Sequence, residues 1–464
     1  MNQQKLLQNI CSGGYKVRYH FVGIGGIGMS SLAMHLRAEG HEVYGSNNEI
    51  NERSNFLRSK GFSVYIGHSS SNWEDPDILV RTTAVKDDNP EVQKAVKTGV
   101  PVVYRMEALK RITKQTNSIC ITGTDGKTTT TAMLSKILID AGCDPSVLLG
   151  GINSSLEFGN YRRGAGPLLT ELDESDGFFA SVKCNHAVVT NVRNDHLEHY
   201  SNKSENLRDH FWHFGNNVSG LLVYNSDDPI LSSIFNGSCV SFGRDSGLYK
   251  ITGRRHSAAV QEFEVLYKNR SLGNYVLRTP GEFNAYNALA AIAASVEFGI
   301  DPDSIRESLL EFSPVDRRFS FRGKNDLRNL DLIDDYAHTP DEIAYTISGA
   351  REFFPDKKIV AVFQPHRYSR LVRENGKFAA SLRGADAVCV YKLYEAYENE
   401  PHEIDEREVV DGLNRYGTPV VHASNYGDIL SWLEDLRDAV VIFMGAGDIT
   451  EASKLSAMKF CTMT

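Results

Sequence analysis

The stretch ITGTDGKTTTT, residues 121–131, combines two glycines, a lysine and a closing run of four threonines, and it follows the residues SIC of an apolar segment. We expect a strand, SICIT, then a glycine turn, then a helix. In such a turn the glycines let backbone N–H groups approach phosphate oxygens, and the helix N-terminus adds its positive dipole end. Lys127 can reach outer phosphates and the Thr128 hydroxyl can ligate Mg²⁺. The stretch therefore predicts nucleotide binding; the alternative is a glycine-rich turn with a solvated lysine.

The segments around this loop alternate between short apolar runs and helical stretches. SICITG, GPLLTEL, HAVVTNV and GLLVYN read as strands of a parallel α/β unit. From about residue 238 to 280 the pattern changes to short alternating segments, SCVSFG, YKITGRR, FEVLYKN and NYVLRTP, which favours a small antiparallel addition. Helix FNAYNALAAIAASVEFG follows. We expect this central, P-loop-type ATP-binding domain to cover residues 115–312.

Two further α/β series flank the central one. Residues 1–114 carry strands such as VRYHFVG, HEVYGS and DILVRT, and the polar stretch KRITKQTNS is interpreted as a linker to the central domain. Residues 313–464 carry LDLIDDY, KKIVAVFQ, DAVCVYKLY and AVVIFMGAGDI. The fold class predicted is α/β in three domains, with Rossmann-like first and third domains.

Composition excludes several classes of protein. Apolar residues at 41% and charged residues at 23% are typical of a globular protein, and no apolar run reaches the length of a membrane span. A net charge of −9 argues against a nucleic-acid binder. The start MNQQKLLQNICSGG lacks the pattern of a secretory signal, so we expect a cytoplasmic location. The seven cysteines are never spaced C-x-x-C, and we expect reduced, mostly buried thiols.

Acids and an imidazole near the phosphate loop are candidates for holding a metal. Glu171 ends the strand PLLTEL and is followed by Asp173, Glu174 and Asp176, while Asn194, Asp195 and His196 follow HAVVTNV. The carboxyl ends of parallel strands meet at one edge of a sheet, where an ATP phosphate tail would need a metal. Alternatively, the acids form a solvated turn and the histidine is a structural one.

A second glycine motif, GIGGIG at residues 23–28, follows the strand VRYHFV and matches G-x-G-x-x-G. Such a loop seats a pyrophosphate on the next helix. A nicotinamide site should also offer an acid about twenty residues on, but Asn47 and Asn48 stand there. The motif therefore leaves three readings: a dinucleotide, another pyrophosphate such as a nucleotide sugar, or a packing turn.

Charged residues in the third series suggest an anion site. Asp335 and His338 follow one strand, Arg367 and Arg370 follow another, and Arg317 lies at the junction between domains. Two arginines separated by three residues can form a fork that binds a carboxylate. A solvated helix N-terminus is the alternative.

Together these motifs resemble the bacterial Mur ligases along nearly the whole chain. The resemblance is carried by HFVGIGGIGMSSLA, GHSSSNW, TAVKDDNPE, GTDGKTTTTAML, ELDESDGFF, TNVRNDHLEHY, GEFNAYNALAAIA, DRRF, DDYAHTPDE, FQPHRYSR and MGAGDI, in the family's order. GIGGIGMS is similar to the branch that joins L-alanine to the lactyl carboxylate of UDP-N-acetylmuramate. The resemblance implies an ATP-dependent ligase of peptidoglycan precursor synthesis that uses Mg²⁺, with two ions expected, as a monomer or weak homodimer. A preference for glycine or serine is the alternative.

The resemblance also implies roles for individual residues. Catalytic roles fall to Lys127, Glu171, His196, Arg317, His338, Arg367 and Arg370. Metal ligands are Thr128, Glu171 and His196. ATP contacts are Gly123, Thr124, Asp125, Gly126, Lys127, Thr128, Thr129, Asn284, Asn287, Arg317 and Asp335. The UDP-sugar site comprises Gly23, Gly25, Gly26, Ile27, Gly28, Ser46, His68, Thr83 and Ala84.

Three positions depart from the family pattern. Asp125 stands where histidine is common, Asn47 where aspartate is common, and Thr339 where a second histidine usually follows His338. Sister ligases use a carbamylated lysine, but SENLRDHFWHF, residues 204–214, contains no lysine and we predict none. Two other hypotheses remain: an unrelated ATPase or kinase with a Rossmann domain, and a non-catalytic UDP-sugar-binding regulator.

Overall fold

The computed structural model describes residues 16–175, 177–193, 200, 203–235, 237, 239–257, 260–396, 398 and 404–461. They form two compact units. The first comprises the described residues of Met1–Thr252, Val265–Gly273 and Asn287–Glu311. The second comprises those of Gly253–Glu264, Asn274–Tyr286 and Phe312–Thr464.

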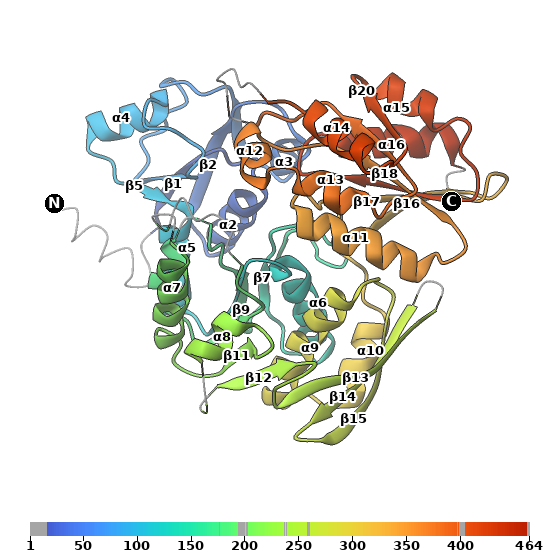
Figure 1. Ribbon diagram of the computed structural model, residues 1–464. Helices are drawn as coiled ribbons and strands as arrows, with labels where there is room; N and C mark the ends of the chain where they lie inside the picture. Colours follow the sequence, from blue (N-terminus) through green and yellow to red (C-terminus); the bar gives the residue numbers. More distant parts are fainter. Residues whose placement is uncertain are drawn as a thin grey trace. The chain divides into compact units, whose positions relative to one another are not determined.

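The chain begins with a five-stranded sheet of order β3-β2-β1-β4-β5 (Figure 1, blue). All its pairings are parallel. Because β1 lies between β2 and β4, the loop after β1 sits where the strand order reverses, which is the usual ligand position in doubly wound sheets. The strands are β1 (Arg18–Val22), β2 (Glu42–Asn47), β3 (Ser63–Ile66), β4 (Ile78–Arg81) and β5 (Val102–Tyr104).

The helices of this sheet are α2 (Ile27–Ala38), α3 (Glu52–Ser59), α4 (Pro90–Thr98) and α5 (Arg105–Gln115). The prediction of a linker at KRITKQTNS was wrong, because its first six residues complete α5. This helix buries Met106, Leu109 and Thr113 on one side and exposes Lys110 and Lys114 on the other. The sequence signal for such a helix is the spacing of its core-facing residues, and α5 has few of them.

The second sheet has ten strands in the order β15-β14-β13-β12-β11-β10-β6-β9-β7-β8. β6 lies between β10 and β9, so the phosphate loop that follows β6 again sits at a reversal of strand order. The strands are β6 (Ser118–Thr122), β7 (Ser146–Leu148), β8 (Tyr161–Arg162), β9 (Leu168–Glu171), β10 (His186–Val189), β11 (Leu222–Asn225), β12 (Val240–Gly243), β13 (Tyr249–Ser257), β14 (Val260–Tyr267) and β15 (Arg270–Leu277).

The antiparallel addition is smaller than the sequence predicts. SCVSFG forms β12, which pairs in parallel with β11 and extends the main sheet. Only β13, β14 and β15 follow one another through two-residue connections, and such short connections allow antiparallel pairing alone. The helical elements of this part are α6 (Lys127–Asp140), η1 (Phe178–Ser181), α7 (Ser204–Asn216), α8 (Pro229–Ile234), α9 (Glu282–Glu297) and α10 (Pro302–Leu310).

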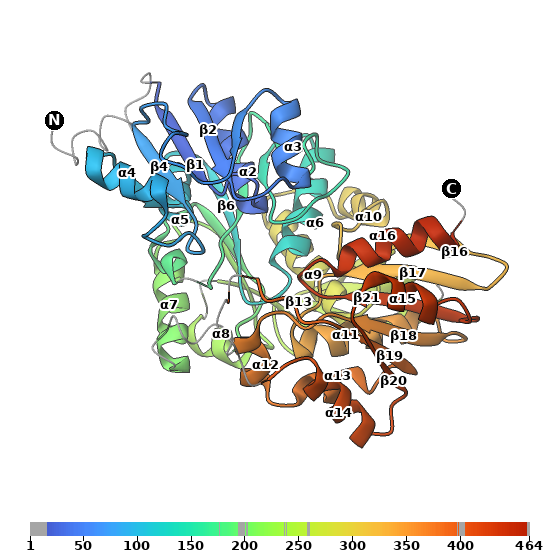
Figure 2. The same ribbon diagram turned by 90° about the horizontal axis from the view of Figure 1, so that it is seen from above.

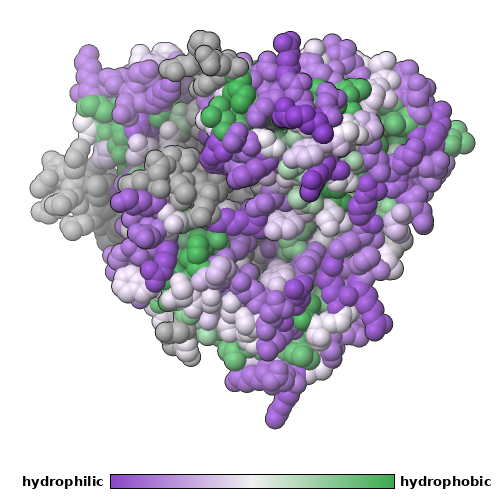
Figure 3. Space-filling model, viewed as in Figure 1, coloured by the Kyte–Doolittle hydropathy of each residue, from purple (hydrophilic) through white to green (hydrophobic). Residues whose placement is uncertain are grey.

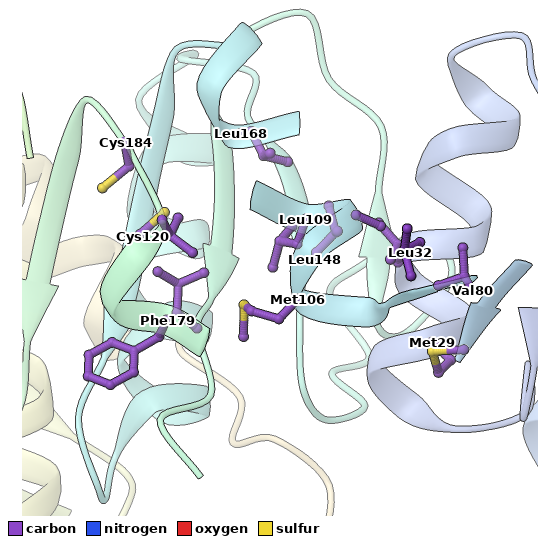
Figure 4. Packing of buried hydrophobic residues seen from close by; sticks show 14 of the residues in the cluster. Met29, Leu32, Val80, Met106, Leu109, Cys120, Leu148, Leu168, Phe179 and Cys184 are labelled. Atoms are coloured by element: carbon purple, nitrogen blue, oxygen red, sulfur yellow. The ribbon is translucent and has the colours of Figure 1, made fainter. Parts of the chain in front are cut away.

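The first sheet and the central sheet share one hydrophobic core. Met29 and Leu32 of α2 belong to the same buried cluster as Leu148 and Leu168 of the central strands. Figure 4 shows Leu109 of α5 in this cluster together with these residues. A continuous apolar interior makes the first unit one packed body rather than two separate ones.

The second unit is built on a six-stranded sheet of order β16-β17-β21-β18-β19-β20. β16 is antiparallel to β17, and the remaining pairings are parallel. Along β18, Ile359 and Ala361 pack in one buried cluster while Val360 and Val362 pack in another, as strand alternation requires. The strands are β16 (Ser320–Asn325), β17 (Leu330–Asp335), β18 (Lys358–Phe363), β19 (Ala387–Tyr391), β20 (Val420–Ala423) and β21 (Ala439–Met444).

Helices cover both faces of this third sheet. Figure 2 shows α11 and α13 on one face and α15 and α16 on the other, in agreement with the two clusters. The helices are α11 (Pro340–Phe353), α12 (Tyr368–Glu374), α13 (Lys377–Leu382), α14 (Arg407–Arg415), α15 (Tyr426–Trp432) and α16 (Ile449–Phe460). The three-domain α/β organisation is therefore confirmed, while the boundaries at 114 and 312 stay predictions.

The exterior is predominantly polar. Figure 3 shows mostly hydrophilic residues over the coloured part of one face, with hydrophobic residues in small separate groups. Within the described part of the chain, none of the helices combines the length and apolar composition that a membrane crossing needs. The six described cysteines form no disulfide; Cys120, Cys184 and Cys389 are buried and the other three are partly buried.

Candidate active site

The phosphate loop of the first unit turns from β6 into α6 as the sequence predicts. Gly126 is the N-cap of α6 with φ +79°, a left-handed conformation that favours glycine. A Cβ on Gly126 would also lie 2.1 Å from Asn287 Oδ1. Both facts require glycine at this position, and they place the amide of Asn287 directly against the loop.

Lys127 is held inside the loop by main-chain and side-chain acceptors. Its Nζ donates to Gly123 O at 2.7 Å, to Thr124 O at 2.9 Å and to Glu174 Oε2 at 2.7 Å. Burial alone lowers the pKa of Lys127, but the carboxylates of Glu174 and Asp173 outweigh burial and raise the pKa above its ordinary value. The ammonium is therefore charged at the place where outer phosphates would bind.

Glu174 is the buried counterion of this lysine. Its side chain is 5% exposed, and burial raises the pKa of Glu174 to about 8, with the negative charge of Asp173 adding to the shift. A carboxyl group so placed carries a partial negative charge near neutral pH. An incoming phosphate would compete with Glu174 for the same ammonium group.

Two of the expected metal ligands lie together. Thr128 Oγ1 donates to Glu171 Oε2 at 2.9 Å, and Gly150 N donates to Glu171 Oε1 at 2.6 Å. A hydroxyl and a carboxylate are hard oxygen donors, so this part of the set fits Mg²⁺. His196 lies outside the described residues. Among the residues that the structure describes, no group of three or more His, Cys, Asp or Glu side chains could hold a metal ion.

The end of β10 supports the loop from its other side. Thr190 Oγ1 donates to Asp125 O at 2.6 Å, and Asn191 O accepts from Thr124 N at 2.9 Å. Asp125, the residue that departs from the family pattern, pairs with Arg193 Nε at 2.8 Å. The departure is thus matched by a cation from the segment that follows β10.

The two asparagines of α9 are both buried. Asn287 Oδ1 accepts from Thr130 Oγ1 at 3.4 Å, in addition to its close approach to Gly126. Asn284 Nδ2 donates to Pro280 O at 2.7 Å, four residues back in the chain. Asn287 therefore contacts the loop itself, and Asn284 supports the start of its own helix.

The glycine motif of the first sheet forms a tight loop between β1 and α2. Gly23 N and Ile24 N donate to Ser46 O at 2.8 and 2.9 Å, and Gly25 N donates to Asn47 Oδ1 at 3.1 Å. An amide oxygen thus accepts from the loop at the position of the unusual Asn47. Gly26 and Ile27 lead directly into α2.

Other predicted members of this site lie at the same carboxyl edge of the sheet. Ser46 is the last residue but one of β2, and its Oγ lies 2.9 Å from His68 Nδ1. Thr83 and Ala84 are exposed in the turn after β4. A Cβ on Gly28 would lie 3.2 Å from an Nη atom of Arg105, so a guanidinium stands beside the loop.

In the second unit, Arg317 is held at the carboxyl ends of β17 and β21. Its φ is +59°, its Nη2 donates to Gly445 O at 2.5 Å and to Gly447 O at 3.2 Å, and it lies 5.0 Å over the Tyr336 ring. Asp335, at the end of β17, accepts from Phe319 N and Ala337 N. Burial raises the pKa of Asp335 to about 6.

His338, His366 and Arg370 gather at the carboxyl ends of neighbouring strands. The rings of His338 and His366 are 6.1 Å apart, and Arg370 Nη1 lies 3.2 Å from His366 Nδ1. Burial, and then Arg370, lowers the pKa of His366 to about 3, so this imidazole is neutral. Arg367 has φ +70° and its N–H donates to Tyr394 O at 2.9 Å. The cluster is cationic, as a carboxylate site requires.

The third departure from the family pattern has a local structural role. Thr339 is the N-cap of α11, where its side chain accepts from Glu342 N at 3.4 Å. Glu342 completes a capping box by accepting from the N–H groups of Thr339 and His338.

Sequence reasoning missed several residues of these sites. It did not find Glu174 as the partner of Lys127, Arg105 beside the glycine loop, or the buried Asn160, whose Nδ2 donates to Ile27 O at 2.7 Å. These contacts join residues far apart in the chain. Of these three residues, only Glu174 had a signal in the sequence, because it belongs to the acidic stretch DESD.

Comparison with known proteins agrees with this arrangement. Models of the Mur ligase family match residues 18–117 (catalytic domain), 121–295 (middle domain) and 317–447 (glutamate ligase domain). A UDP-N-acetylmuramate–L-alanine ligase of Thermotoga maritima is 41% identical over 442 residues, which cover 94% of this chain and 95% of that protein. One from Aquifex aeolicus is 37% identical over 449 residues, covering 94% and 96%.

A solved structure gives the same result. The crystal structure of the UDP-N-acetylmuramate-alanine ligase from Thermotoga maritima superposes with a TM-score of 0.87 at 38% identity, covering 96% of this chain and 99% of that one. Because the similarity runs through all three sheets and through both loops described above, the chain belongs to the Mur ligase family.

Proposed function

We propose that this protein joins L-alanine to the lactyl carboxylate of UDP-N-acetylmuramate, with conversion of ATP to ADP and phosphate. One observation carries the proposal: a relative so named is 41% identical and matches the chain over 95% of that relative's own length. The phosphate loop supports it, because Lys127, Thr128 and Glu171 converge at one edge of the central sheet.

ATP is proposed to bind through residues 123–129, with Lys127 at the β- and γ-phosphates. Asn287 lies beside the loop, and Asn284, Asp335 and Arg317 are the further proposed contacts. Thr128, Glu171 and His196 would hold Mg²⁺, which supplies positive charge to phosphate oxygens when bound. The ammonium of Lys127 would leave Glu174 for the phosphates as ATP enters.

The chemistry needs an activated acid, because a free carboxylate does not accept an amine at neutral pH. The lactyl carboxylate attacks the γ-phosphorus and ADP leaves, which gives an acyl phosphate. The amine of alanine attacks the acyl carbon, the amine loses a proton, and phosphate departs from the tetrahedral intermediate. Lys127 stabilises the charge that grows on the transferring group. Holding acyl carbon and amine together can lower the barrier by about 7–11 kcal/mol.

The remaining sites are assigned by their charge. The loop at residues 23–28, with Ser46, His68, Thr83 and Ala84, is proposed to bind the sugar nucleotide, and Arg105 places a cation beside its diphosphate. His338, Arg367 and Arg370 are proposed to receive alanine, because the cationic cluster suits its carboxylate. We also propose the domain boundaries 114 and 312, a cytoplasmic location in line with ATP and sugar nucleotide as substrates, and a monomer or weak homodimer.

A phosphate-release assay with each substrate omitted in turn tests the proposal. We expect phosphate only when UDP-N-acetylmuramate, ATP and an amino acid are all present. Equal ADP formation without an amino acid would instead indicate a kinase or ATPase, and binding of the sugar nucleotide without turnover would indicate a regulator. A panel of alanine, glycine and serine in the same assay decides the amino-acid preference, and we expect alanine to give the highest kcat/KM.

A further inference from the structure

Glu91 is a fully buried carboxylate in the first turn of α4, a helix that packs on the first sheet. Its Oε2 accepts from Ser46 Oγ at 2.6 Å and lies 2.8 Å from His20 Nε2. Its Oε1 accepts from Ser69 N at 3.0 Å and from Asn72 Nδ2 at 2.8 Å. A carboxylate removed from water is costly unless every lone pair is used, and here four partners use them.

The ionised form of Glu91 sets the direction of these hydrogen bonds. Burial alone raises the pKa of Glu91, but the hydrogen bonds from His20 and Ser46, together with the nearby His68 ring, lower the pKa well below its usual range. An ionised carboxylate only accepts hydrogen bonds. The single proton of the Ser46 hydroxyl is therefore directed to Glu91, and the Ser46 oxygen can offer only its lone pairs to other groups.

His68 is the group that meets those lone pairs. Its Nδ1 lies 2.9 Å from Ser46 Oγ, whereas its distance to Glu91 Oε1 is 3.8 Å, too long for a hydrogen bond. Nδ1 must therefore carry the proton that Ser46 accepts. In a neutral imidazole protonated at Nδ1, Nε2 has a free lone pair and acts as an acceptor.

The network lies at the ligand edge of the sheet. Ser46 lies at the carboxyl end of β2, one residue before Asn47, and its main-chain oxygen accepts from Gly23 N and Ile24 N of the glycine loop. His68 follows β3 with its side chain 19% exposed. The carboxyl edge of a doubly wound sheet is where ligands bind. Any ligand in the proposed sugar-nucleotide site would meet the exposed side of this ring.

We propose that Glu91 is a positioning residue of the sugar-nucleotide site: through Ser46 it keeps His68 protonated at Nδ1, so that His68 Nε2 accepts a hydrogen bond from an N–H or O–H group of the nucleotide. His20 anchors the carboxylate from the opposite side; it is fully buried, and its Nδ1 has no hydrogen-bond partner within the described chain. This assignment deepens the proposed function and rests on it for the nature of the ligand.

The tautomer of His68 is measured directly by ¹⁵N NMR of the full-length protein labelled on histidine, with His68→Gln used to assign the signal. We expect an Nδ1–H, Nε2-unprotonated ring in the wild type and loss of that preference in Ser46→Ala. An Nε2–H ring in the wild type would overturn the proposal. Neither result depends on ligase activity, so this test separates the network from the proposed reaction.

Binding measurements test the consequence for the ligand. In Glu91→Gln the single amide oxygen can replace only one of the two carboxylate oxygens, so the amide NH2 faces either Ser46 and His20 or the donors Ser69 N and Asn72 Nδ2. We expect this disturbance of the network to raise the Kd for UDP about tenfold while the Kd for ATP changes less than twofold. Asp88→Asn, which removes an exposed carboxylate three residues away, is the matched control and should leave both constants unchanged. An equal Kd for UDP in Glu91→Gln and Asp88→Asn would refute the positioning role.

UDP analogues identify which group of the nucleotide donates the hydrogen bond to His68 Nε2. If His68 reads the base, 3-methyl-UDP should lose affinity for the wild type and lose much less for His68→Gln; if it reads the ribose, the deoxy-UDP analogues should show this pattern. The same loss in both proteins for every analogue would contradict an acceptor role of His68. If Glu91→Gln does not fold, as judged by circular dichroism, the wild-type tautomer and the analogue series still decide the proposal.

Discussion

Lys127 illustrates how a reactive cation is kept ready in a buried position. Its ammonium donates to two main-chain oxygens and to Glu174, which hold it in place in the absence of phosphates. The arrangement requires that phosphate oxygens replace Glu174, which carries only a partial negative charge near neutral pH, as the acceptor for this ammonium. The balance between the two should therefore set ATP affinity.

Removing this ammonium should remove turnover. We expect Lys127→Ala to lower kcat in the phosphate-release assay at least about 10²–10³-fold, because a charged donor aimed at the developing charge is lost. Lys136→Ala, on the same helix and paired with Asp140, is the control and should keep wild-type activity. Turnover in a folded Lys127→Ala close to that of the wild type would refute the phosphate role.

Asp335 should make stability depend on pH. Its pKa is raised to about 6 by burial, against about 3.9 in an unfolded chain, so the native state holds the proton more tightly between these values. The contribution of Asp335 to stability must then fall as pH rises from about 4 to 6, by up to about 3 kcal/mol. Asp335→Asn should flatten this slope in thermal melts taken across that range, while Asp326→Asn in an exposed turn should keep it. Parallel slopes for wild type and Asp335→Asn would contradict the shift.

At the scale of an element, the two ends of helix α6 differ in how closely a neighbouring element approaches their glycines. Both ends carry glycines of positive φ, Gly126 at +79° and Gly142 at +73°. Only Gly126 faces another element closely, since its Cβ would meet Asn287, whereas no atom lies within 4 Å of a Cβ on Gly142. The N-terminal end must therefore fit against α9, and the C-terminal end is free of such contact.

Substitution by alanine separates backbone strain from the steric conflict. Gly142→Ala should cost about 1–2 kcal/mol, the price of the left-handed conformation alone. Gly126→Ala should cost clearly more and also raise the Kd for ATP, because the loop has to move away from Asn287. Urea unfolding and nucleotide titration of both variants measure this. Equal effects of the two substitutions would show that the contact with Asn287 does not matter.

At the scale of the whole molecule, the first unit is tied together by a polar contact as well as by its core. Asn160 is buried and directly precedes β8. Its Nδ2 donates to Ile27 O at 2.7 Å and to Ser30 Oγ at 2.9 Å, and its Oδ1 accepts from Arg53. The start of α2, and with it the glycine loop, is thus positioned by a residue of the central domain.

Asn160→Ala should therefore affect both stability and one substrate. We expect a loss of about 1–3 kcal/mol, because buried partners are left without hydrogen bonds, and a higher KM for UDP-N-acetylmuramate with the KM for alanine unchanged. Asn55→Ala, an exposed position on α3, should change stability by less than about 0.5 kcal/mol. Unfolding curves and steady-state kinetics of the two variants measure this. A wild-type KM for UDP-N-acetylmuramate in Asn160→Ala would show that this contact between the two domains does not affect binding of the sugar nucleotide.

Local patterns were sufficient for the elements that carry their own signal. Strand-turn-helix at residues 118–131 and 18–38 is encoded by apolar runs followed by glycines, and the structure confirms both. The helix at 105–115 was missed in part because its buried residues are few, and only packing against the shared core shows which face they form. The prediction that β12 belongs to the antiparallel addition was wrong, because the residues of a strand do not specify which strand lies beside it.

By itself the sequence determined the three α/β domains, the two glycine loops and the convergence of Thr128 with Glu171, because alternating strands and helices give parallel sheets whose strands share one carboxyl edge. Only the tertiary structure decided that Glu174 binds Lys127, that Asn160 supports α2, and that Glu91 directs Ser46 and His68. Each of these contacts joins residues more than twenty positions apart. Such pairs depend on how whole elements pack, and burial alone makes their hydrogen bonds obligatory.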